Sequence, residues 1–422
     1  MRILLANYTR SITGGAEKYL QALIPSLIQR GHSLALLYEY PCASGAQSVD
    51  SPEGAIPSWC LQELGCDSVV RSATHWQPDV VYCHGLDDGR LESELLEKFR
   101  VILFAHTYYG TCVSGRKCYS WPRLQPCERE FGVECLALYY PRRCGGLNAR
   151  TAWQLFRAQS GRRSRLKNYH AVLVASRHMY QEYERHGVAG ERLELVPLFP
   201  TDSTPQPDCP SFRKPGGRIL FLGRLVDVKG PAYLLQAIPA ASAKLGRPLT
   251  LTVGGDGQDR AALEELARKL GLTVDFAGWV DSCKRGELMR QADLLAVPSL
   301  WPEPFGLAGV EAACLGLPAV GYAVGGIPDW LISGQTGELA AADPPTVEGL
   351  ADAMVRALRD SAHYNELRNG AWHMSRQFNL NRHIAQLEPI LAGEQSSSVT
   401  PERRPAALAT EDAAPQARSS LR

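Results

Sequence analysis

The chain has 422 residues, of which 45% are hydrophobic and 21% charged, with 45 Lys and Arg against 44 Asp and Glu. This length is too great for one simple core and predicts two or three domains, with large α/β units favouring two. The near-neutral charge excludes a globally basic nucleic-acid binder and a highly acidic disordered chain, so no nucleic-acid partner is expected.

The start of the chain predicts a cytosolic protein. Only the apolar residues 3–6 precede Asn7 and Tyr8, which is too short for the apolar region of a signal peptide. No run approaches the roughly 18 apolar residues of a membrane span. We therefore expect a cytoplasmic location and reduced thiols at the twelve cysteines.

Short apolar runs alternate with helical patterns along the first half, beginning with a run at residues 2–6 and an amphipathic helix at 16–30. Alternating strands and helices predict a parallel sheet that is covered on both faces. The further strands predicted in this half are at 34–38, 80–82, 101–105, 171–175 and 193–196.

Six prolines between residues 197 and 217 interrupt the pattern, and we place a domain boundary there. The alternation then restarts, which predicts a second doubly wound α/β unit. Its predicted strands are at 218–222, 249–253, 273–277, 294–297 and 319–322, with closing helices at 347–358 and 381–391.

The predicted organisation has an N-terminal domain and a C-terminal domain of the same class, followed by a helix that packs back on the first domain and by a disordered tail. The expected bounds are 1–200 for the first domain, about 110–146 for a cysteine-rich insertion within it, 201–217 for the linker, 218–375 for the second domain, 376–394 for the helix and 395–422 for the tail.

Two loops that follow first strands carry residues suited to anions. Gly14 and Gly15 let the backbone approach a ligand, and the helix after them offers free N–H groups; a plain tight turn is the alternative. In the second domain Arg224 and Lys229, five positions apart, flank a loop that opens a helix. Two cations there suit a diphosphate, although a solvated Arg and Lys would give the same pattern.

The stretch 298–311 contains Glu303 and Glu311, eight positions apart on either side of a predicted helix start. Each carboxylate can accept hydrogen bonds from a different hydroxyl pair of one ligand, with the N–H groups of Gly306 and Leu307 between them. Isolated glutamate pairs are usually solvated. The flanks are apolar here, so neither carboxylate should be tolerated without a polar partner.

Glu303 and Glu311, with Pro304, Phe305 and Gly306 between them, resemble the E-x7-E signature of the retaining glycosyltransferases of family 4, also called glycosyl transferases group 1. The resemblance covers about residues 1–392 and implies the GT-B fold, with two Rossmann-like doubly wound parallel-sheet domains facing an interdomain cleft. The other similar segments are 14–17, 221–224 with 229–230, 253–257, 276–280, and 324–328 with 334–337.

The resemblance implies roles for individual residues. Arg224 and Lys229 would hold the diphosphate of a nucleoside diphosphate sugar, Glu311 the ribose, and Glu303 the transferred sugar. The family's N-domain histidine best matches His106, with His84 as the competing candidate. The further donor-binding residues implied are Gly14, Gly15, Gly223, Gly255, Trp279, Val280, Phe305, Gly306 and Leu307.

The implied reaction moves a hexose from a UDP- or GDP-sugar to a glycan or lipid-linked acceptor with retention of configuration, in surface polysaccharide or glycolipid assembly. Cations at the leaving group would stabilise the charge that develops there, and no cofactor or catalytic metal is required. Asp87 and Asp88 are interpreted as a polar loop, not as a metal motif. One departure from the family is Asp329, where many relatives have a glutamate.

Two other functions remain as alternatives. The chain could be a non-catalytic sugar-nucleotide-binding subunit of a polysaccharide assembly complex. A dinucleotide-dependent oxidoreductase is disfavoured, because the loop 7–15 lacks a Gly-x-Gly-x-x-Gly fingerprint.

Residues 142–167 contain eight basic and no acidic side chains, with Trp153, Leu155 and Phe156 among them. A basic amphipathic helix of this kind could contact an anionic membrane peripherally or receive an anionic acceptor. The alternative is a solvated helix whose apolar residues pack on the first domain.

Five cysteines fall within the predicted insertion and lack the Cys-x2-Cys spacing of a zinc knuckle. Ordinary buried or free thiols, a structural zinc site and disulfides remain open for them. These residues are Cys112, Cys118, Cys127, Cys135 and Cys144.

Overall fold

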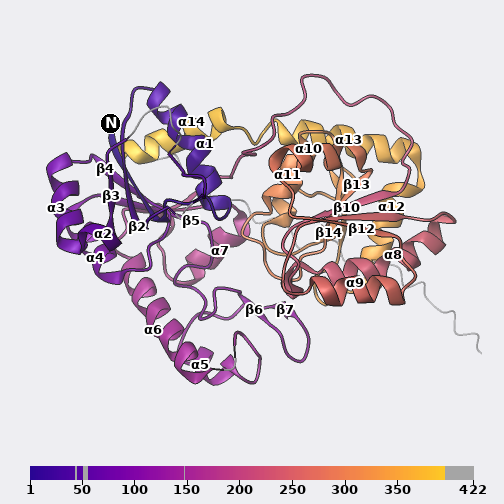
Figure 1. Ribbon diagram of the computed structural model, residues 1–422, viewed down its shortest axis with the longest axis horizontal. Coiled ribbons are helices and arrows are strands. Elements are labelled where there is room, and N and C mark those ends of the chain that lie inside the picture. Colours follow the sequence, from indigo (N-terminus) through magenta and orange to yellow (C-terminus); the bar gives the residue numbers. More distant parts are fainter. Residues whose placement is uncertain (43–44, 51–55, 147, 395–422) are drawn as a thin grey trace, which may run out of the picture.

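The structure, a computed structural model, describes residues 1–42, 45–50, 56–146 and 148–394, and the disorder predicted for 395–422 lies outside them. Two parallel sheets dominate the molecule, one in each domain (Figure 1). The predicted fold class is thereby confirmed.

The first sheet has the strand order β3-β2-β1-β4-β5-β8-β9. Helices cover both faces of this sheet, and its central strands are accordingly apolar; β5 (VILFA), for example, is buried at every residue. The strands are β1 (Arg2–Thr9), β2 (Ser33–Tyr40), β3 (Ser58–Cys60), β4 (Val80–Cys83), β5 (Val101–Ala105), β8 (Ala171–Val174) and β9 (Leu193–Leu195). The helices are α1 (Gly15–Gln29), α2 (Leu61–Leu64), α3 (Cys66–Trp76), α4 (Gly89–Lys98), α5 (Glu134–Tyr139), α6 (Ala149–Leu166) and α7 (Arg177–Arg185).

The second sheet has the order β12-β11-β10-β13-β14-β15. Its strands are β10 (Arg218–Leu222), β11 (Thr250–Gly254), β12 (Val274–Gly278), β13 (Leu294–Val297), β14 (Ala319–Tyr322) and β15 (Gly337–Ala340). Its helices are α8 (Pro231–Leu245), α9 (Arg260–Lys269), α10 (Ser282–Gln291), α11 (Leu307–Ala313), α12 (Val347–Arg359) and α13 (Ser361–Ser375). Every strand predicted above is present, whereas β3, β15 and α13 were not predicted.

The strand order reverses direction beside the first strand of each sheet. Strand β1 lies between β2 and β4, and β10 lies between β11 and β13. Ligands of open α/β sheets bind outside the carboxyl ends of the strands at such a switch point. The loops after β10 and β13, which carry Lys229 and Glu303, therefore meet at one edge of the second sheet.

The last helix, α14 (Leu380–Ala392), lies on the first domain beside α1 (Figure 1). Its buried side chains Ile384, Leu387 and Leu391 belong to the apolar core. Its His383 Nε2 is 2.8 Å from the Tyr19 hydroxyl of α1. The first domain is thus completed by residues from the far end of the chain.

Between β5 and β8 the chain forms a separate unit, here called the insertion lobe (residues 110–166, apart from the undescribed residue 147). It contains the antiparallel hairpin β6 (Cys118–Tyr119) and β7 (Gln125–Pro126), with α5 and α6. The lobe projects beyond the first sheet (Figure 1). A small core of its own holds it together, made of Val113, Phe131, Tyr139, Cys144 and Ala152.

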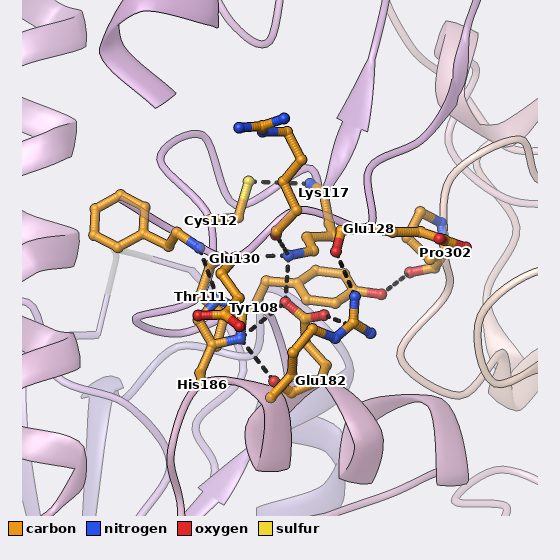
Figure 2. Close-up of polar contacts among 12 residues, drawn as sticks. Tyr108, Thr111, Cys112, Lys117, Glu128, Glu130, Glu182, His186 and Pro302 are labelled. Carbon is orange, nitrogen blue, oxygen red and sulfur yellow. Dashed lines mark hydrogen bonds and ion pairs between the residues drawn. The ribbon is translucent and has the colours of Figure 1, made fainter. Parts of the chain in front are cut away.

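A buried ion pair joins the insertion lobe to α7. The Lys117 ammonium contacts the Glu182 carboxylate, with side-chain exposures of 2% and 0% (Figure 2). Lys117 Nζ also donates to the Arg129 carbonyl at 2.6 Å. The His186 ring accepts the Phe131 N–H at Nε2 (2.9 Å) and therefore donates from Nδ1 to the Glu182 carbonyl (2.7 Å). These contacts fix the lobe against the sheet.

Replacing Lys117 by methionine should lower the free energy of unfolding by about 3 kcal/mol, because the buried Glu182 charge loses its nearest cation and keeps only the more distant Arg185, at 3.4 Å. Denaturant unfolding followed by circular dichroism measures the change. The control is Lys98→Met, which removes an exposed lysine paired with Glu94 on α4 and should leave the midpoint unchanged. Equal midpoints for the two variants would contradict the assigned role of the buried pair.

Candidate active site

The Glu303 carboxylate is buried and meets a cation from a neighbouring loop. Its Oε1 lies 2.6 Å from Lys229 Nζ and accepts the Ser299 hydroxyl at 2.5 Å. Lys229 ends a 3₁₀ turn (Asp227–Lys229) after β10, whereas Glu303 follows β13. Adjacent strands therefore bring the two sequence-predicted residues together, and the carboxylate has the polar partner that its apolar surroundings require.

Electrostatics keep Glu303 ionised. Burial alone would raise the pKa of this carboxyl, but the Lys229 ammonium and the hydrogen bonds from Lys229 and Ser299 hold it below its ordinary value. Lys229 Nζ also lies 5.4 Å from the centre of the Trp301 ring. The site therefore contains a fixed negative charge directly beside a positive one.

Helix α11 begins between the two glutamates. Gly306 precedes it with φ of 88°, a left-handed conformation that favours glycine. The Trp330 ring nitrogen donates to the Phe305 carbonyl at 2.7 Å and supports the turn. The Gly309 N–H closes the first turn on the Gly306 carbonyl at 3.1 Å, whereas the N–H groups of Leu307 and Ala308 precede the first intrahelical bond, which suits them to an anionic or hydroxyl ligand.

Glu311 is also buried, with 2% exposure. Its Oε2 lies 3.0 Å from Nη1 of Arg285, which comes from α10. Burial raises the pKa of Glu311 to about 7, although the Arg285 charge opposes the increase. The two signature glutamates therefore differ near neutral pH, because Glu303 is ionised while Glu311 is close to its titration midpoint.

Arg285 extends this contact into the first domain. Its other terminal nitrogen contacts Asp202 of the interdomain segment, which in turn lies 2.6 Å from Lys18 Nζ of α1. Opposite charges thus alternate from Lys18 through Asp202 and Arg285 to Glu311. Sequence reasoning missed Lys18, Asp202 and Arg285, because 184 positions separate Lys18 from Asp202 and no local motif marks them.

The two candidate histidines lie together at the ends of neighbouring strands, β4 and β5. His84 Nδ1 is 3.0 Å from His106 Nε2. Burial lowers the pKa of His106 to about 3 and that of His84 well below its ordinary value, so both rings are neutral. His84 is 8% exposed, whereas His106 is only half-buried. His106 therefore has the more accessible ring of the two.

Several contacts hold the β5 end against the Glu303 loop. The Tyr108 hydroxyl, two residues after His106, donates to the Pro302 carbonyl at 2.6 Å (Figure 2). The Arg177 N–H at the start of α7 donates to Asp329 Oδ2 at 2.7 Å. Asp329, which stands where many relatives have a glutamate, therefore makes a hydrogen bond between the two domains. Arg116 of the insertion lobe reaches Asp227 at 2.8 Å.

The other predicted donor-binding residues lie around the same edge. Arg224 is exposed and makes no side-chain ion pair with the residues the structure describes. Trp279 is 81% exposed after β12, while Val280 packs against the core. A Cβ on Gly255 would come within 1.9 Å of the Gly223 carbonyl, so these two loops touch. Gly14 and Gly15 open α1 across the cleft.

The insertion cysteines do not form a recognisable metal site. All twelve cysteines are free thiols, and Cys118 and Cys144 are buried. Among the described residues, no group of three or more His, Cys, Asp or Glu side chains is arranged to hold a metal ion. The zinc and disulfide alternatives therefore gain no support from the structure. Throughout the residues that the structure describes, no helix combines the length and apolar character needed to cross a membrane.

Two family models match the chain. "Glycosyltransferase Family 4" matches residues 13–199, and "Glycosyl transferases group 1" matches residues 209–374. The chain belongs to this glycosyltransferase family. The two matches correspond to the two sheets, so both halves of the family fold are present.

Curated relatives match this family member mainly over part of their length. A glycogen synthase of Mycobacterium tuberculosis is 36% identical over 34% of this chain and 34% of its own. A 2-deoxystreptamine glucosyltransferase of Streptomyces kanamyceticus is 34% identical over 43% of this chain and 48% of its own. The matches thus span between a third and a half of these relatives.

The fold extends over nearly the whole chain. The crystal structure of HepE from Anabaena in complex with UDP and glucose covers 93% of this chain and 100% of its own, with a TM-score of 0.63 at 19% identity. This likeness concerns the fold of the glycosyltransferase family, and confirms two facing parallel-sheet domains.

The Glu311 carboxyl should titrate near pH 7, and Arg285→Gln should raise its pKa further, because the arginine charge favours the ionised form. Carbon-13 NMR of labelled glutamate measures the titration, with Glu311→Gln identifying the signal. A Glu311 signal that titrates near the ordinary value of 4.5 would contradict the assignment.

The same shift has a consequence for stability. A carboxyl whose folded pKa lies above its unfolded value costs stability as pH rises between the two values. Glu311→Gln should therefore stabilise the protein at pH 8 by up to about 3 kcal/mol relative to its effect at pH 4. Denaturant unfolding at both pH values measures this difference, and a gain of the same size at both would contradict it.

Proposed function

We propose that the protein is a retaining glycosyltransferase that moves a hexose from a nucleoside diphosphate sugar to a glycan or lipid-linked acceptor. The observation that carries the proposal is the pair of buried glutamates on either side of the α11 start. Each contacts a cation from another element, Lys229 for Glu303 and Arg285 for Glu311. A sugar, a diphosphate and a ribose would each find a complementary group along this edge.

Arg224 and Lys229 would hold the departing diphosphate. Arg224 is exposed and has no ion-pair partner among the described residues, and the Lys229 side chain is 22% exposed beside Glu303. The bond from the anomeric carbon to the phosphate oxygen breaks as charge develops on that oxygen, and two cations stabilise it. The acceptor hydroxyl bonds to the same face of the sugar and passes its proton to the departing phosphate.

His106 would contact the transferred sugar from the opposite domain. Its ring is neutral at physiological pH, since its pKa is about 3. A neutral imidazole can orient a sugar hydroxyl by hydrogen bonding without competing as a cation for the diphosphate. The Tyr108 hydroxyl on Pro302 supports this placement, because it joins the His106 loop to the Glu303 loop.

The proposed donor is a UDP- or GDP-sugar. UDP and glucose accompany the similar HepE structure, so UDP-sugars are the first donors to test, with GDP-sugars second. The charges of Arg224 and Lys229 can replace a metal ion at the diphosphate, and transfer should therefore continue in EDTA. Curated relatives include a phosphatidyl-myo-inositol mannosyltransferase, which supports a lipid-linked acceptor in glycolipid or surface polysaccharide assembly.

Glu303→Gln and Lys229→Met should each lower kcat/KM by at least about 100-fold, because each removes a charge beside the reacting sugar. The rate of nucleoside diphosphate release from donor sugars, with and without acceptor, provides the measurement. The exposed pair Glu348 and Lys244 supplies matched controls, Glu348→Gln and Lys244→Met, which should retain normal rates. Near-normal turnover by either site variant would contradict the proposal.

The alternative of a non-catalytic sugar-nucleotide-binding subunit gives a different result in the same assay. Calorimetry would show that such a protein binds UDP or GDP. The release assay would show no nucleotide set free from any donor sugar, whether or not an acceptor is present.

A further inference from the structure

Large apolar side chains lie exposed on the insertion lobe. Trp121 and Trp153 are each 53% exposed, Tyr140 is 39% exposed and Val133 is 70% exposed. Scattered exposed apolar residues need no explanation, but these four belong to one lobe with its own small core. On helix α6, Leu155 and Phe156 pack against that core, whereas Trp153 of the same helix is exposed to solvent.

Unpaired arginines lie among these aromatic residues. The Arg143 guanidinium lies 5.1 Å from the centre of the Trp121 ring, and the Arg143 N–H bonds to the Tyr140 carbonyl at 3.0 Å. On α6, Arg150, Trp153 and Arg157 follow the spacing of one helix face. Arg143, Arg150 and Arg157 are exposed, and none makes an ion pair with the residues that the structure describes.

The other basic residues of α6 face the protein. Arg162 pairs with Asp87, Arg165 with Glu92 at 2.7 Å, and Arg163 with Glu130 of the lobe at 3.7 Å. The second half of the helix is therefore held by ion pairs against the first domain and the lobe. The first half of the helix and the loops around Trp121 and Arg143 carry exposed arginines and aromatic rings but no acidic side chain, and the exposed acids of the lobe (Glu128, Glu130 and Glu134) lie in the segment after β7 and at the start of α5.

The insertion lobe also borders a cleft of about 1430 Å³. Tyr119 and Arg129 of the lobe line one side, Arg185 of α7 another, and Gly325 and Asp329 of the second domain the third. Pro302, next to Glu303, also lines it. A molecule held beside the lobe thus has a path toward the Glu303 loop.

We propose that the insertion lobe binds the surface of an anionic lipid membrane and thereby brings a lipid-linked acceptor to this cleft. Trp and Tyr favour the membrane–water interface, where an amphipathic ring meets both phases. Arginines beside them are attracted to anionic headgroups, and the attraction is screened by salt. Membrane binding stands on the lobe alone, whereas delivery of an acceptor rests on the proposed glycosyltransferase function.

The test is co-sedimentation of the full chain with vesicles of phosphatidylcholine alone or with 30% phosphatidylglycerol. The variant Trp153→Ser/Arg157→Glu should bind the anionic vesicles at least about tenfold more weakly, because it loses one interfacial ring and reverses one charge. The control Phe212→Ser/Arg359→Glu removes an exposed ring of the interdomain linker and an exposed arginine of the second domain and should bind as the unaltered chain does.

Binding that requires phosphatidylglycerol, falls with added salt and is lost only in the lobe variant would support the proposal. The proposal is overturned if the unaltered chain stays in the supernatant, if neutral vesicles bind it equally, or if both variants behave alike. Nucleotide release in solution is measured in parallel. Vesicle binding without release contradicts the proposed function alone, whereas release without vesicle binding contradicts the membrane surface alone.

Discussion

The arrangement of the site depends on one constraint, which is that two carboxylates are buried within eight positions of each other and each needs a positive partner. Neither partner comes from the same segment. Lys229 arrives from the loop after β10 and Arg285 from α10. The sheet order that places β10 beside β13 is what makes the first pairing possible. A ligand that contacts Glu303 or Glu311 would therefore meet a carboxylate that already has a cationic partner.

The two ion pairs differ in whether they connect the two domains. The Lys229 pair is confined to the second domain, whereas Arg285 also contacts Asp202, which contacts Lys18 of the first domain. The state of the Glu311 carboxyl therefore affects a chain of charges that crosses between domains. The Tyr108 hydroxyl on Pro302 makes a second crossing close to Glu303. Both signature glutamates thus lie beside a contact between the domains.

Local patterns were sufficient for most of the strands and for the two parallel-sheet units, and they singled out Glu303 and Glu311, each of which is buried beside a cation. Apolar runs and turn residues determine strands and turns over a few neighbouring positions, and such short patterns can be recognised in a sequence. The partners of Glu311 were not predictable, because a surface-like Arg285 and an aspartate in a proline-rich segment look ordinary until the fold brings them together. The same holds for Lys117 and Glu182, whose burial depends on how the insertion lobe folds over α7. The sequence left thiols, a zinc site and disulfides open for the five insertion cysteines, and in the structure Cys144 belongs to the lobe core as a small apolar side chain.

The return of α14 to the first domain affects how the chain folds during synthesis. Ribosomes deliver the N-terminal residues first, and domains generally fold as units once they are complete. Here the apolar surface around Tyr19 that contacts His383 stays uncovered until the whole second domain has been made. A nascent or C-terminally shortened chain therefore leaves this apolar surface of the first domain exposed to water.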